Sequence, residues 1–283
     1  MPTKVVYLVS GSNRGIGQGL VTTLAKRPNA IVFAGARDPS AASLKELAAK
    51  HPNVYPVKLV LNDKQSNEAA AAYIVQTAGQ LDVVIANAGI AKHFGTVADA
   101  PISEFKDHYE ANTLGMVVLW QAVHKILVAS PTGAPVFAYT STIAGSIGAF
   151  VNMNSPTYGH SKAAANYIVK CLDAENPNLV AMAIHPGWVQ TEMGNGGATA
   201  SGLPAAPYTL DETVAGILGR IDGATREKCG GKFWNAVPVV GDPAASDNVT
   251  VFNPNCLNTS SSIFSLSLVS SHEHMDFFSY FQF

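Results

Sequence analysis

Charged side chains are scarce in this chain. Asp, Glu, Lys and Arg make up 13% of its 283 residues, about half the share of an ordinary globular domain. The formal net charge of −2 and the pI near 6.4 indicate no basic surface that would hold a phosphate backbone. We therefore expect no nucleic acid among the partners.

Cysteine is also scarce, with only Cys171, Cys229 and Cys256 in the whole chain. Three cysteines spread so widely suit neither a disulfide framework nor a zinc site. His272 and His274 lie in a Ser-rich segment, where such a pair is usually a solvated turn. We expect a reducing, cytoplasmic location and no bound metal.

Long hydrophobic runs are missing. No stretch approaches 18 apolar residues, and the apolar run that begins at Val5 is too short for a signal peptide. We therefore expect neither a membrane span nor a membrane partner.

Short apolar runs, in contrast, recur along the chain. They are VVYLVS from Val5, AIVFAGA from Ala30, VYPVKLVL from Val54, LDVVIAN from Leu81, APVFAYTS from Ala134 and LVAMAIHP from Leu179. Continuous apolar runs of this length are typical of parallel strands buried on both faces, and the segments between them have helical periodicity. The alternation predicts an α/β fold with a doubly wound, Rossmann-like parallel sheet, which binds its ligand beyond the carboxyl ends of the strands.

The composition changes near the end of the chain. GGKFWN from Gly230 predicts a last short strand, but no Lys or Arg follows Lys232. We divide the chain into one Rossmann-like domain, residues 1–236, and an atypical tail, residues 237–283, which we expect to be poorly ordered. The alternative is that aromatic side chains of the tail cover a contact between subunits. In that case the protein would be a homo-oligomer.

A glycine-rich turn follows the first predicted strand, with Gly11, Gly15 and Gly17 leading into a helix. Glycines in this position let the backbone approach a pyrophosphate, whose charge then lies at the helix N-terminus. Glycines alone are weak support, but here a strand precedes them and a helix follows. The sequence therefore predicts a dinucleotide site.

Two arginines indicate which dinucleotide binds. An NAD-preferring protein usually has an acid at the end of its second strand, where this chain has Ala36 followed by Arg37. Arg14 lies in the glycine turn itself, and two guanidiniums near the ribose suit a 2′-phosphate. We predict NADP(H). The alternative is that Arg37 pairs with Asp38 or with solvent and that Arg14 is simply exposed.

Tyr158 and Lys162 are four residues apart in SPTYGHSKAAANY, so a helix would place them on one face. A cationic neighbour, joined by a second positive charge, would lower the pKa of the tyrosine. The pair is a candidate proton donor with the lysine that tunes it. Taken alone, the spacing also fits a structural tyrosine beside a snorkelling lysine stem.

Together these motifs resemble the short-chain dehydrogenase/reductase family. The glycine turn matches its Gly-x-x-x-Gly-x-Gly pattern, Asn87-Ala88-Gly89 its Asn-Ala-Gly strand end, and Tyr158 with Lys162 its Tyr-x-x-x-Lys pair. Asn112 in EANTLG resembles the helix asparagine of the family. The segment PGWVQTEM from Pro186 resembles its Pro-Gly segment, in which Thr191 matches the threonine that contacts the nicotinamide. The resemblance runs from about Val5 to Asn235 and is strongest to carbonyl reductases and to fungal ketoreductases of the norsolorinic acid type.

The resemblance implies an NADPH-dependent carbonyl reductase that acts on a small-molecule ketone or aldehyde, in a role compatible with fungal secondary metabolism. Tyr158 would protonate the alkoxide. Lys162 would bind the nicotinamide ribose and, with the oxidised ring, lower the Tyr158 pKa, while Asn112 would hold a water that relays protons to Lys162. The cofactor-binding residues that it implies are Gly11, Asn13, Arg14, Gly15, Ile16, Gly17, Arg37, Asn87, Ala88, Gly89, Tyr158, Lys162, Pro186, Gly187, Val189 and Thr191.

Two positions depart from the family pattern. The family has a serine as the substrate-binding hydroxyl three residues before a glycine, and counting back from Gly145 selects Thr142, with Ser141 as the alternative. Threonine keeps the hydroxyl donor but adds a methyl group and a stiffer χ1. Near the adenine the family often has an acid, where this chain has Val60, with Asn62 and Asp63 close by, so we expect backbone contacts there.

The substrate side is less distinct in the sequence. GNGGATASGLPAAPY, residues 194–208, predicts either a mobile flap over the substrate or a plain surface loop, and we favour the flap. Phe94, Phe150 and Trp188 are candidate walls of a pocket, and each would equally suit a core.

Two other functions fit parts of the pattern. A nucleotide-sugar epimerase or dehydratase also uses a Tyr-Lys pair, but it has a different glycine spacing and a larger substrate domain. A non-catalytic NADP(H)-binding redox sensor, or an inactive variant, would need the cofactor site without Tyr158, Lys162 and Asn112 together.

Overall fold

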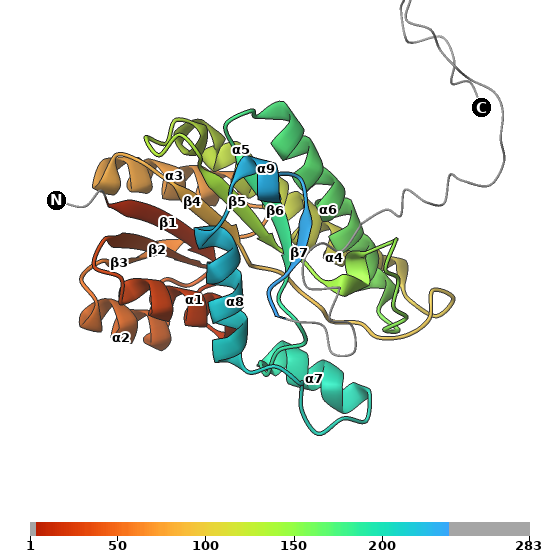
Figure 1. Ribbon diagram of the computed structural model, residues 1–283. Coiled ribbons are helices and arrows are strands. Elements are labelled where there is room, and N and C mark those ends of the chain that lie inside the picture. Colours follow the sequence, from red (N-terminus) through yellow and green to blue (C-terminus); the bar gives the residue numbers. More distant parts are fainter. Residues whose placement is uncertain (1–3, 238–283) are drawn as a thin grey trace, which may run out of the picture. The chain divides into compact units, whose positions relative to one another are not determined.

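Seven parallel strands form a single sheet in the computed structural model, which describes residues 4–237. In chain order they are β1 (Val5–Ser10), β2 (Ala30–Ala36), β3 (Val54–Lys58), β4 (Val83–Ala86), β5 (Val136–Thr140), β6 (Val180–His185) and β7 (Phe233–Asn235). Across the sheet their order is β3-β2-β1-β4-β5-β6-β7 (Figure 1). The predicted doubly wound sheet is confirmed, and its order reverses between β1 and β4, where such sheets bind ligands.

Helices cover both faces of the sheet. One face carries α1 (Gly15–Ala25), α2 (Ala42–Lys50), α8 (Leu210–Asp222) and the short α9 (Arg226–Cys229); the other carries α3 (Lys64–Ala78), α5 (Gly115–Val128) and α6 (Pro156–Glu175). Helix α4 (Ile102–Tyr109) packs on α6, and a π-helical turn, η1 (Glu110–Leu114), joins it to α5. A 3₁₀ turn, η2 (Ile143–Gly145), follows β5, and α7 (Glu192–Ala200) follows β6.

The strands are hydrophobic at nearly every position because both faces of the sheet are covered. In β1, Val6 and Leu8 pack toward α3, α5 and α6, whereas Tyr7 and Val9 pack toward α1, α2 and α8. Successive side chains of a strand point to opposite faces. The core therefore consists of two layers separated by the sheet.

The third strand is shorter than its apolar run. The predicted strand covered residues 54–61, but β3 ends at Lys58. Asn62 has a φ of 61°, and the Asp63 side chain accepts a hydrogen bond from the Ser66 N–H and so caps α3. The turn and the helix cap decide the boundary here, although Leu59 remains buried.

Helix α4, the turn η1 and helix α5 form one long helical stretch. From Ile102 to Val128 the chain is long and apolar enough to cross a membrane by length and composition. In the structure Met116, Leu119 and Val123 of this stretch lie in the core beside the sheet. Packing on the sheet therefore accounts for its apolar character, as in the core helices of many globular domains.

The end of the described chain is still part of the domain. Val237, which the sequence assigned to the tail, is buried, and a Cβ added to Gly187 would lie 2.6 Å from its Cγ2 atom. The rest of the predicted tail, with Cys256 and the two histidines, lies outside the described residues.

Candidate active site

The candidate residues gather at the carboxyl ends of β1, β4, β5 and β6. β1 leads into the glycine turn, β4 into Asn87-Ala88-Gly89, β5 into Ser141 and Thr142, and β6 into Pro186 and Gly187. Parallel strands place these carboxyl ends along one edge of the sheet. The fold thus brings together motifs as far apart in the chain as Gly11 and Gly187.

The glycine turn has the shape that a dinucleotide phosphate requires. Gly11 has a φ of 69°, and Gly17, in the first turn of α1, lies so close to Gly11 that an added Cβ would lie 2.1 Å from the Gly11 carbonyl oxygen. A side chain at Gly17 would fill the space in which the turn and the helix meet. The residues therefore fit a bound pyrophosphate at the N-terminus of α1, with Asn13 exposed and Ile16 half-buried beside it.

Ser10, the last residue of β1, ties the glycine turn to the end of β4. Its hydroxyl oxygen accepts hydrogen bonds from the Asn87 and Ala88 N–H groups at 2.9 and 3.0 Å. The Asn87 side chain donates to the Ser10 carbonyl at 3.1 Å, and a Cβ added to Gly11 would lie 3.0 Å from the Ala88 Cα. The two predicted cofactor segments thus form one rigid surface.

The two predicted phosphate-binding arginines differ in their contacts. Arg37 is exposed at the end of β2, and Asp38 accepts hydrogen bonds from Ser40 rather than pairing with Arg37. Arg14 forms an ion pair with Glu192, the first residue of α7. Arg14 therefore already has an anionic partner across the cofactor edge, which the sequence did not predict.

The segment after β6 lies over the glycine turn. Gly187 has a φ of 89°, and the Pro186 carbonyl accepts a hydrogen bond from Thr213. The Thr191 hydroxyl caps α7 by accepting from the Gly194 N–H at 3.1 Å, and its methyl group would lie 3.5 Å from a Cβ on Gly15. Thr191 thus has a structural role at the place where a nicotinamide contact is predicted, and Val189 beside it is buried.

At Val60, where we expect the adenine, the backbone N–H and carbonyl already form hydrogen bonds within the protein. The Val60 N–H donates to the Ser66 hydroxyl, and its carbonyl accepts from Asn67 and from the Asp63 N–H. The Asp63 carboxylate caps α3. The backbone of Val60 therefore has little capacity left for the expected adenine contact.

Lys162 is buried between the Tyr158 side chain and the end of β4. Its Nζ donates a hydrogen bond to the Thr140 carbonyl at 2.7 Å and lies 5.7 Å from the centre of the Tyr158 ring. A Cβ added to Gly89 would lie 3.5 Å from the same Nζ. Tyr158 and Lys162 therefore lie on one face of α6, as the sequence predicts, and the ammonium faces the Asn-Ala-Gly segment.

Burial controls the protonation of both groups. It raises the pKa of Tyr158 and lowers the pKa of Lys162 to about 7. A carboxylate beside Lys162 would raise its pKa again, but within residues 4–237 no carboxylate forms an ion pair with it. The expected lowering of the Tyr158 pKa is thus not seen in the protein alone, because loss of hydration outweighs the single cation nearby.

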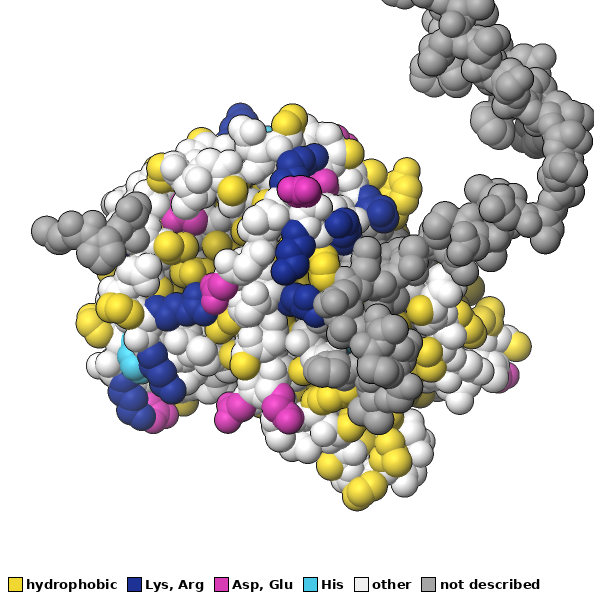
Figure 2. Space-filling model, viewed as in Figure 1, with side chains coloured by type: hydrophobic (Ala, Val, Ile, Leu, Met, Phe, Trp, Pro, Cys, Tyr) yellow, Lys and Arg dark blue, Asp and Glu magenta, His cyan; other side chains and the backbone are white. Residues whose placement is uncertain are grey.

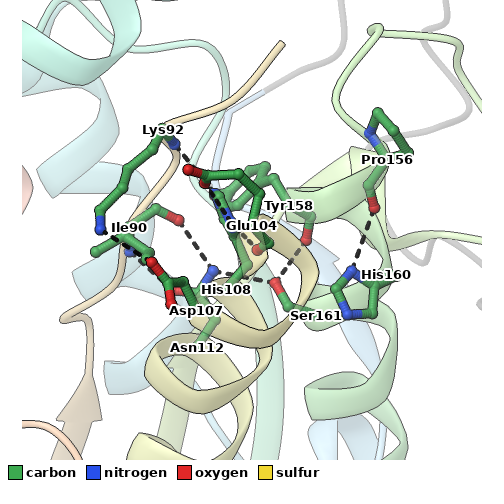
Figure 3. Close-up of polar contacts among 10 residues, drawn as sticks. All are labelled: Ile90, Lys92, Glu104, Asp107, His108, Asn112, Pro156, Tyr158, His160 and Ser161. Carbon is green, nitrogen blue, oxygen red and sulfur yellow. Dashed lines mark hydrogen bonds and ion pairs between the residues drawn. The ribbon is translucent and has the colours of Figure 1, made fainter. Parts of the chain in front are cut away.

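Asn112 lies in the π-helical turn, and its side chain makes three hydrogen bonds (Figure 3). Its Oδ1 accepts from the Ile90 N–H at 2.8 Å, and its Nδ2 donates to the Ile90 carbonyl and the Ser161 hydroxyl. Ser161 in turn donates to the Tyr158 carbonyl at 2.7 Å. Asn112 therefore joins the loop after β4 to the helix that carries Tyr158, and the predicted water-binding role would fall to its backbone or to the remaining Oδ1 lone pair.

His108 adds a second link between the same parts (Figure 3). Its ring is fully buried and lies edge-on to the Tyr158 ring, with the centroids 6.5 Å apart. Its Nε2 accepts from the Lys92 N–H, so Nδ1 carries the proton that binds the Glu104 carbonyl. The histidine thus supports one side of the tyrosine ring.

The two candidate hydroxyls after β5 have different partners. Ser141 is buried, and its hydroxyl donates to Asn166 Oδ1 at 2.6 Å. The Thr142 hydroxyl oxygen accepts from the Ala144 N–H at 3.3 Å, an interaction that leaves its proton for another acceptor. The geometry therefore favours Thr142 as the substrate-binding donor, as counted from Gly145.

The predicted flap is helical in its first half. α7 covers Glu192–Ala200, although it contains three glycines, and Thr191 caps its start. A Cβ added to Gly197 would lie 3.7 Å from the rings of both Phe94 and Trp188. Two of the three candidate wall residues thus meet at α7, while Phe150 is exposed.

A cavity of about 540 Å³ opens beside these segments. It is lined by Phe94, Gly95, Thr96, Met153, Asn154, Ala200 and Ser201. The lining comes from the loop after β4, the segment before α6 and the end of α7. Figure 2 shows hydrophobic side chains gathered where α7 lies.

Several residues of the site carry no motif and were missed from the sequence. Ser10, Tyr139, Ser161 and Glu192 act through contacts with segments distant in the chain. The one usable signal was position: Ser10 directly precedes the glycine turn, and Tyr139 lies in the strand that leads into Ser141, two residues before it. Within residues 4–237, no group of three or more His, Cys, Asp or Glu could hold a metal ion.

Comparison with known proteins places these features in a family. A family model of short chain dehydrogenases matches residues 4–200. The norsolorinic acid ketoreductase of Aspergillus parasiticus is 37% identical over 243 residues, which cover 82% of this chain and 88% of that protein. An uncharacterized oxidoreductase of Schizosaccharomyces pombe is 36% identical over 193 residues, which cover 67% of this chain and 76% of that protein.

Solved structures of carbonyl reductases have the same fold. An NADPH-bound carbonyl reductase from chicken fatty liver superposes with a TM-score of 0.73 at 30% identity, over 83% of this chain and 93% of that one. The carbonyl reductase Sniffer of Drosophila melanogaster superposes with a TM-score of 0.74 at 26% identity, over 83% of this chain and 97% of that one.

Proposed function

The chain belongs to the short-chain dehydrogenase family, and on that premise we propose that it is an NADPH-dependent reductase of ketones or aldehydes with Tyr158 as the proton donor. The observation that carries the proposal is the position of the buried Lys162 ammonium, between the Tyr158 ring and Gly89 of the predicted cofactor surface. A structural Tyr-Lys pair would have no reason to bury the ammonium at this edge, because burial of a charge without a counterion costs free energy.

NADPH, when bound, supplies the hydride. The glycine turn would hold its pyrophosphate, and Arg37 the 2′-phosphate. Arg14 would join Arg37 only by leaving Glu192. Lys162 would hold the nicotinamide ribose through the two ammonium hydrogens that Thr140 does not use. The NADPH of the chicken carbonyl reductase supports this choice of cofactor.

The protein itself handles the proton and the developing charge. A Tyr158 hydroxyl with a raised pKa stays protonated at neutral pH, so it is ready to donate a hydrogen bond and then a proton to an alkoxide. Thr142 would donate a second hydrogen bond to the same oxygen. Positive charge on Lys162 favours the phenolate that results, and the ammonium therefore matters most after the proton has left Tyr158.

The substrate is proposed to be a bulky, largely apolar carbonyl compound. Phe94, Phe150, Val151 and Met193 are at least 45% exposed around the loops that line the cavity, and its lining has no charged side chain. Apolar surface of this kind is typical of a binding groove. Similarity to norsolorinic acid ketoreductases of fungi supports this substrate class and a role in secondary metabolism. A cytoplasmic location remains part of the proposal.

The experiment compares the wild-type chain with Tyr158→Phe. We expect the wild type to oxidise NADPH in the presence of aromatic ketones and the variant to lose turnover by at least about 100-fold, since the proton donor is gone. Both proteins should keep a rise in unfolding temperature of about 5 °C or more with saturating NADPH and a much smaller one with NADH. Full activity of the variant would refute Tyr158 as donor. Equal shifts with both nucleotides would refute the cofactor preference.

A redox sensor without turnover is the alternative function. The ion pair of Arg14 with Glu192 favours it to some degree, since it links the predicted cofactor turn to α7 and would report cofactor binding to that helix. Firm NADPH binding without reduction of any compound in a broad ketone and aldehyde panel would support it over the reductase.

A further inference from the structure

Lys162 has little of what normally stabilises a buried charge. Its side chain is 3% exposed, and within residues 4–237 its hydrogen bond goes to the Thr140 carbonyl. The ionisable groups that the described elements bring to it are Tyr158 from its own helix and Tyr139 from β5, with His108 of α4 behind Tyr158. No carboxylate in that range pairs with it. The charge must therefore be supported by dipoles and rings.

Tyr139 provides the nearer ring. The Lys162 Nζ lies 4.5 Å from the centre of the Tyr139 ring, compared with 5.7 Å for Tyr158. Both distances are within the range at which the negative face of an aromatic ring attracts a cation, and the attraction is stronger where water is absent. Tyr139 is 1% exposed. Its ring therefore lies against the ammonium in a dry environment.

The hydroxyl of Tyr139 reaches the other part of the site. It donates a hydrogen bond to the backbone carbonyl of Asn112 at 3.0 Å, and the bond is buried. Asn112 lies in the π-helical turn that holds the loop after β4. One side chain thus contacts both the lysine and the asparagine turn.

We propose that Tyr139 is a positioning residue of this active site, whose ring face keeps the Lys162 ammonium charged and in place and whose hydroxyl anchors the Asn112 turn. The inference rests on the proposed reductase function for its effect on turnover, but the contact with Lys162 is independent of it. The motif pattern in the sequence assigns no role to this position.

Loss of the Tyr139 ring should change the Lys162 pKa in one direction. Burial lowers the pKa of Lys162 to about 7, and the ring opposes that change because it favours the charged form. Removing the ring should lower the pKa further, by about one unit for a desolvated cation–π contact. The lysine would then lose its charge at a lower pH, and the alkaline decline in carbonyl reduction would move to lower pH with it.

The experiment uses three variants of the full chain. Tyr139→Leu removes ring and hydroxyl, Tyr139→Phe removes the hydroxyl alone, and Phe137→Leu removes a ring from a fully buried neighbour on the same strand. Phe137 packs on Trp120, so its loss reports the general cost of a cavity in β5. If the leucine variant at position 139 does not fold, Tyr139→Met replaces it.

The Lys162 titration is followed by NMR on protein with isotope-labelled lysine, with the signal assigned through Lys162→Met, and the pH profile of turnover is measured alongside. We expect Tyr139→Leu to lower the Lys162 pKa and the alkaline limb by about one unit. Tyr139→Phe should keep the Lys162 pKa but reduce turnover several-fold. Phe137→Leu should lower the unfolding temperature with both pH readouts unchanged.

Two results would overturn the proposal. One is that Tyr139→Leu leaves the Lys162 pKa unchanged, and the other is that Phe137→Leu lowers the Lys162 pKa by as much as Tyr139→Leu does. If the wild type shows no turnover, the reductase function fails, and the NMR titration still decides whether Tyr139 supports the lysine.

Discussion

At the scale of single residues, the site depends on which polar atoms already have a partner. Ser141 and Thr142 are adjacent and both carry hydroxyls, yet Ser141 binds Asn166 inside the core, whereas Thr142 keeps its proton for another acceptor. Asn166 is itself buried and also donates to the Gly145 carbonyl. Ser141 is therefore held in the core, and the proposed substrate-binding donor is Thr142.

This difference predicts opposite effects of two substitutions. Thr142→Val keeps the shape but removes the donor, and we expect turnover to fall by about 100-fold or more, as for loss of an oxyanion donor. Loss of the bond from the Ala144 N–H should lower the unfolding free energy by about 1 kcal/mol. Ser141→Ala leaves Asn166 Oδ1 without its partner and should cost about 1–3 kcal/mol of unfolding free energy with most of the turnover retained.

Steady-state kinetics and urea unfolding of both variants check this prediction, with Thr142→Ser as the matched control that restores the hydroxyl and should retain activity. If Ser141→Ala loses turnover and Thr142→Val does not, the hydroxyl assignment is reversed.

At the scale of elements, the cofactor edge depends on how closely the first helix can approach its turn. Gly17 is the position at which backbone meets backbone, since an added Cβ would lie 2.1 Å from the Gly11 carbonyl and 2.8 Å from Asn87 Nδ2. The first neighbour is backbone, and the second is a side-chain amide held by its hydrogen bond to the Ser10 carbonyl. The start of α1 and the end of β4 would both have to move.

We therefore expect Gly17→Ala to weaken NADPH binding by at least about 100-fold, the effect of a small misplacement of a binding surface. The matched control is Gly219→Ala in α8, where an added Cβ meets nothing within 4 Å and the helix should gain up to about 1 kcal/mol. Fluorescence titration with NADPH and thermal unfolding measure the two effects. Normal NADPH affinity in Gly17→Ala would contradict the close-approach argument.

At the scale of the whole molecule, stability in acid should depend on a histidine at the end of the central sheet. His185 is the last residue of β6, and its Nδ1 is buried without a hydrogen-bond partner among the described residues. Burial lowers its pKa from 6.5 to about 4. The unfolded chain therefore binds the proton first as the pH falls.

Protonation of His185 should destabilise the folded protein in acid. Between pH 6.5 and pH 4 the unfolded state holds more protons than the folded state at this site, so the free energy of unfolding decreases as the pH falls through that window, by about 3 kcal/mol at most. Urea unfolding at pH 7 and at pH 4.5 should show this loss in the wild type and a smaller one in His185→Gln. Equal losses in both proteins would show that other groups control acid unfolding.

Much of the architecture followed from the sequence by itself. Buried parallel strands need continuous apolar runs, so six strands of a doubly wound sheet were predictable, as was the short last strand after Gly230, whereas the order of the strands came only from the structure. A close approach of the first helix to its turn needs glycine at Gly11 and Gly17. The spacing of Tyr158 and Lys162 likewise placed them on one helical face, because residues four apart are neighbours on any α-helix.

The tertiary structure alone decided what surrounds these residues. The Tyr139 ring beneath Lys162, the Ser10 hydroxyl under Asn87 and the Arg14–Glu192 pair each join segments far apart in the chain, and no local pattern encodes such contacts. The same holds for the pKa of Tyr158. The motif predicts a cation beside it, but the loss of water around both groups depends on the packing of α4, α6 and β5, and in the protein alone that burial has the larger effect.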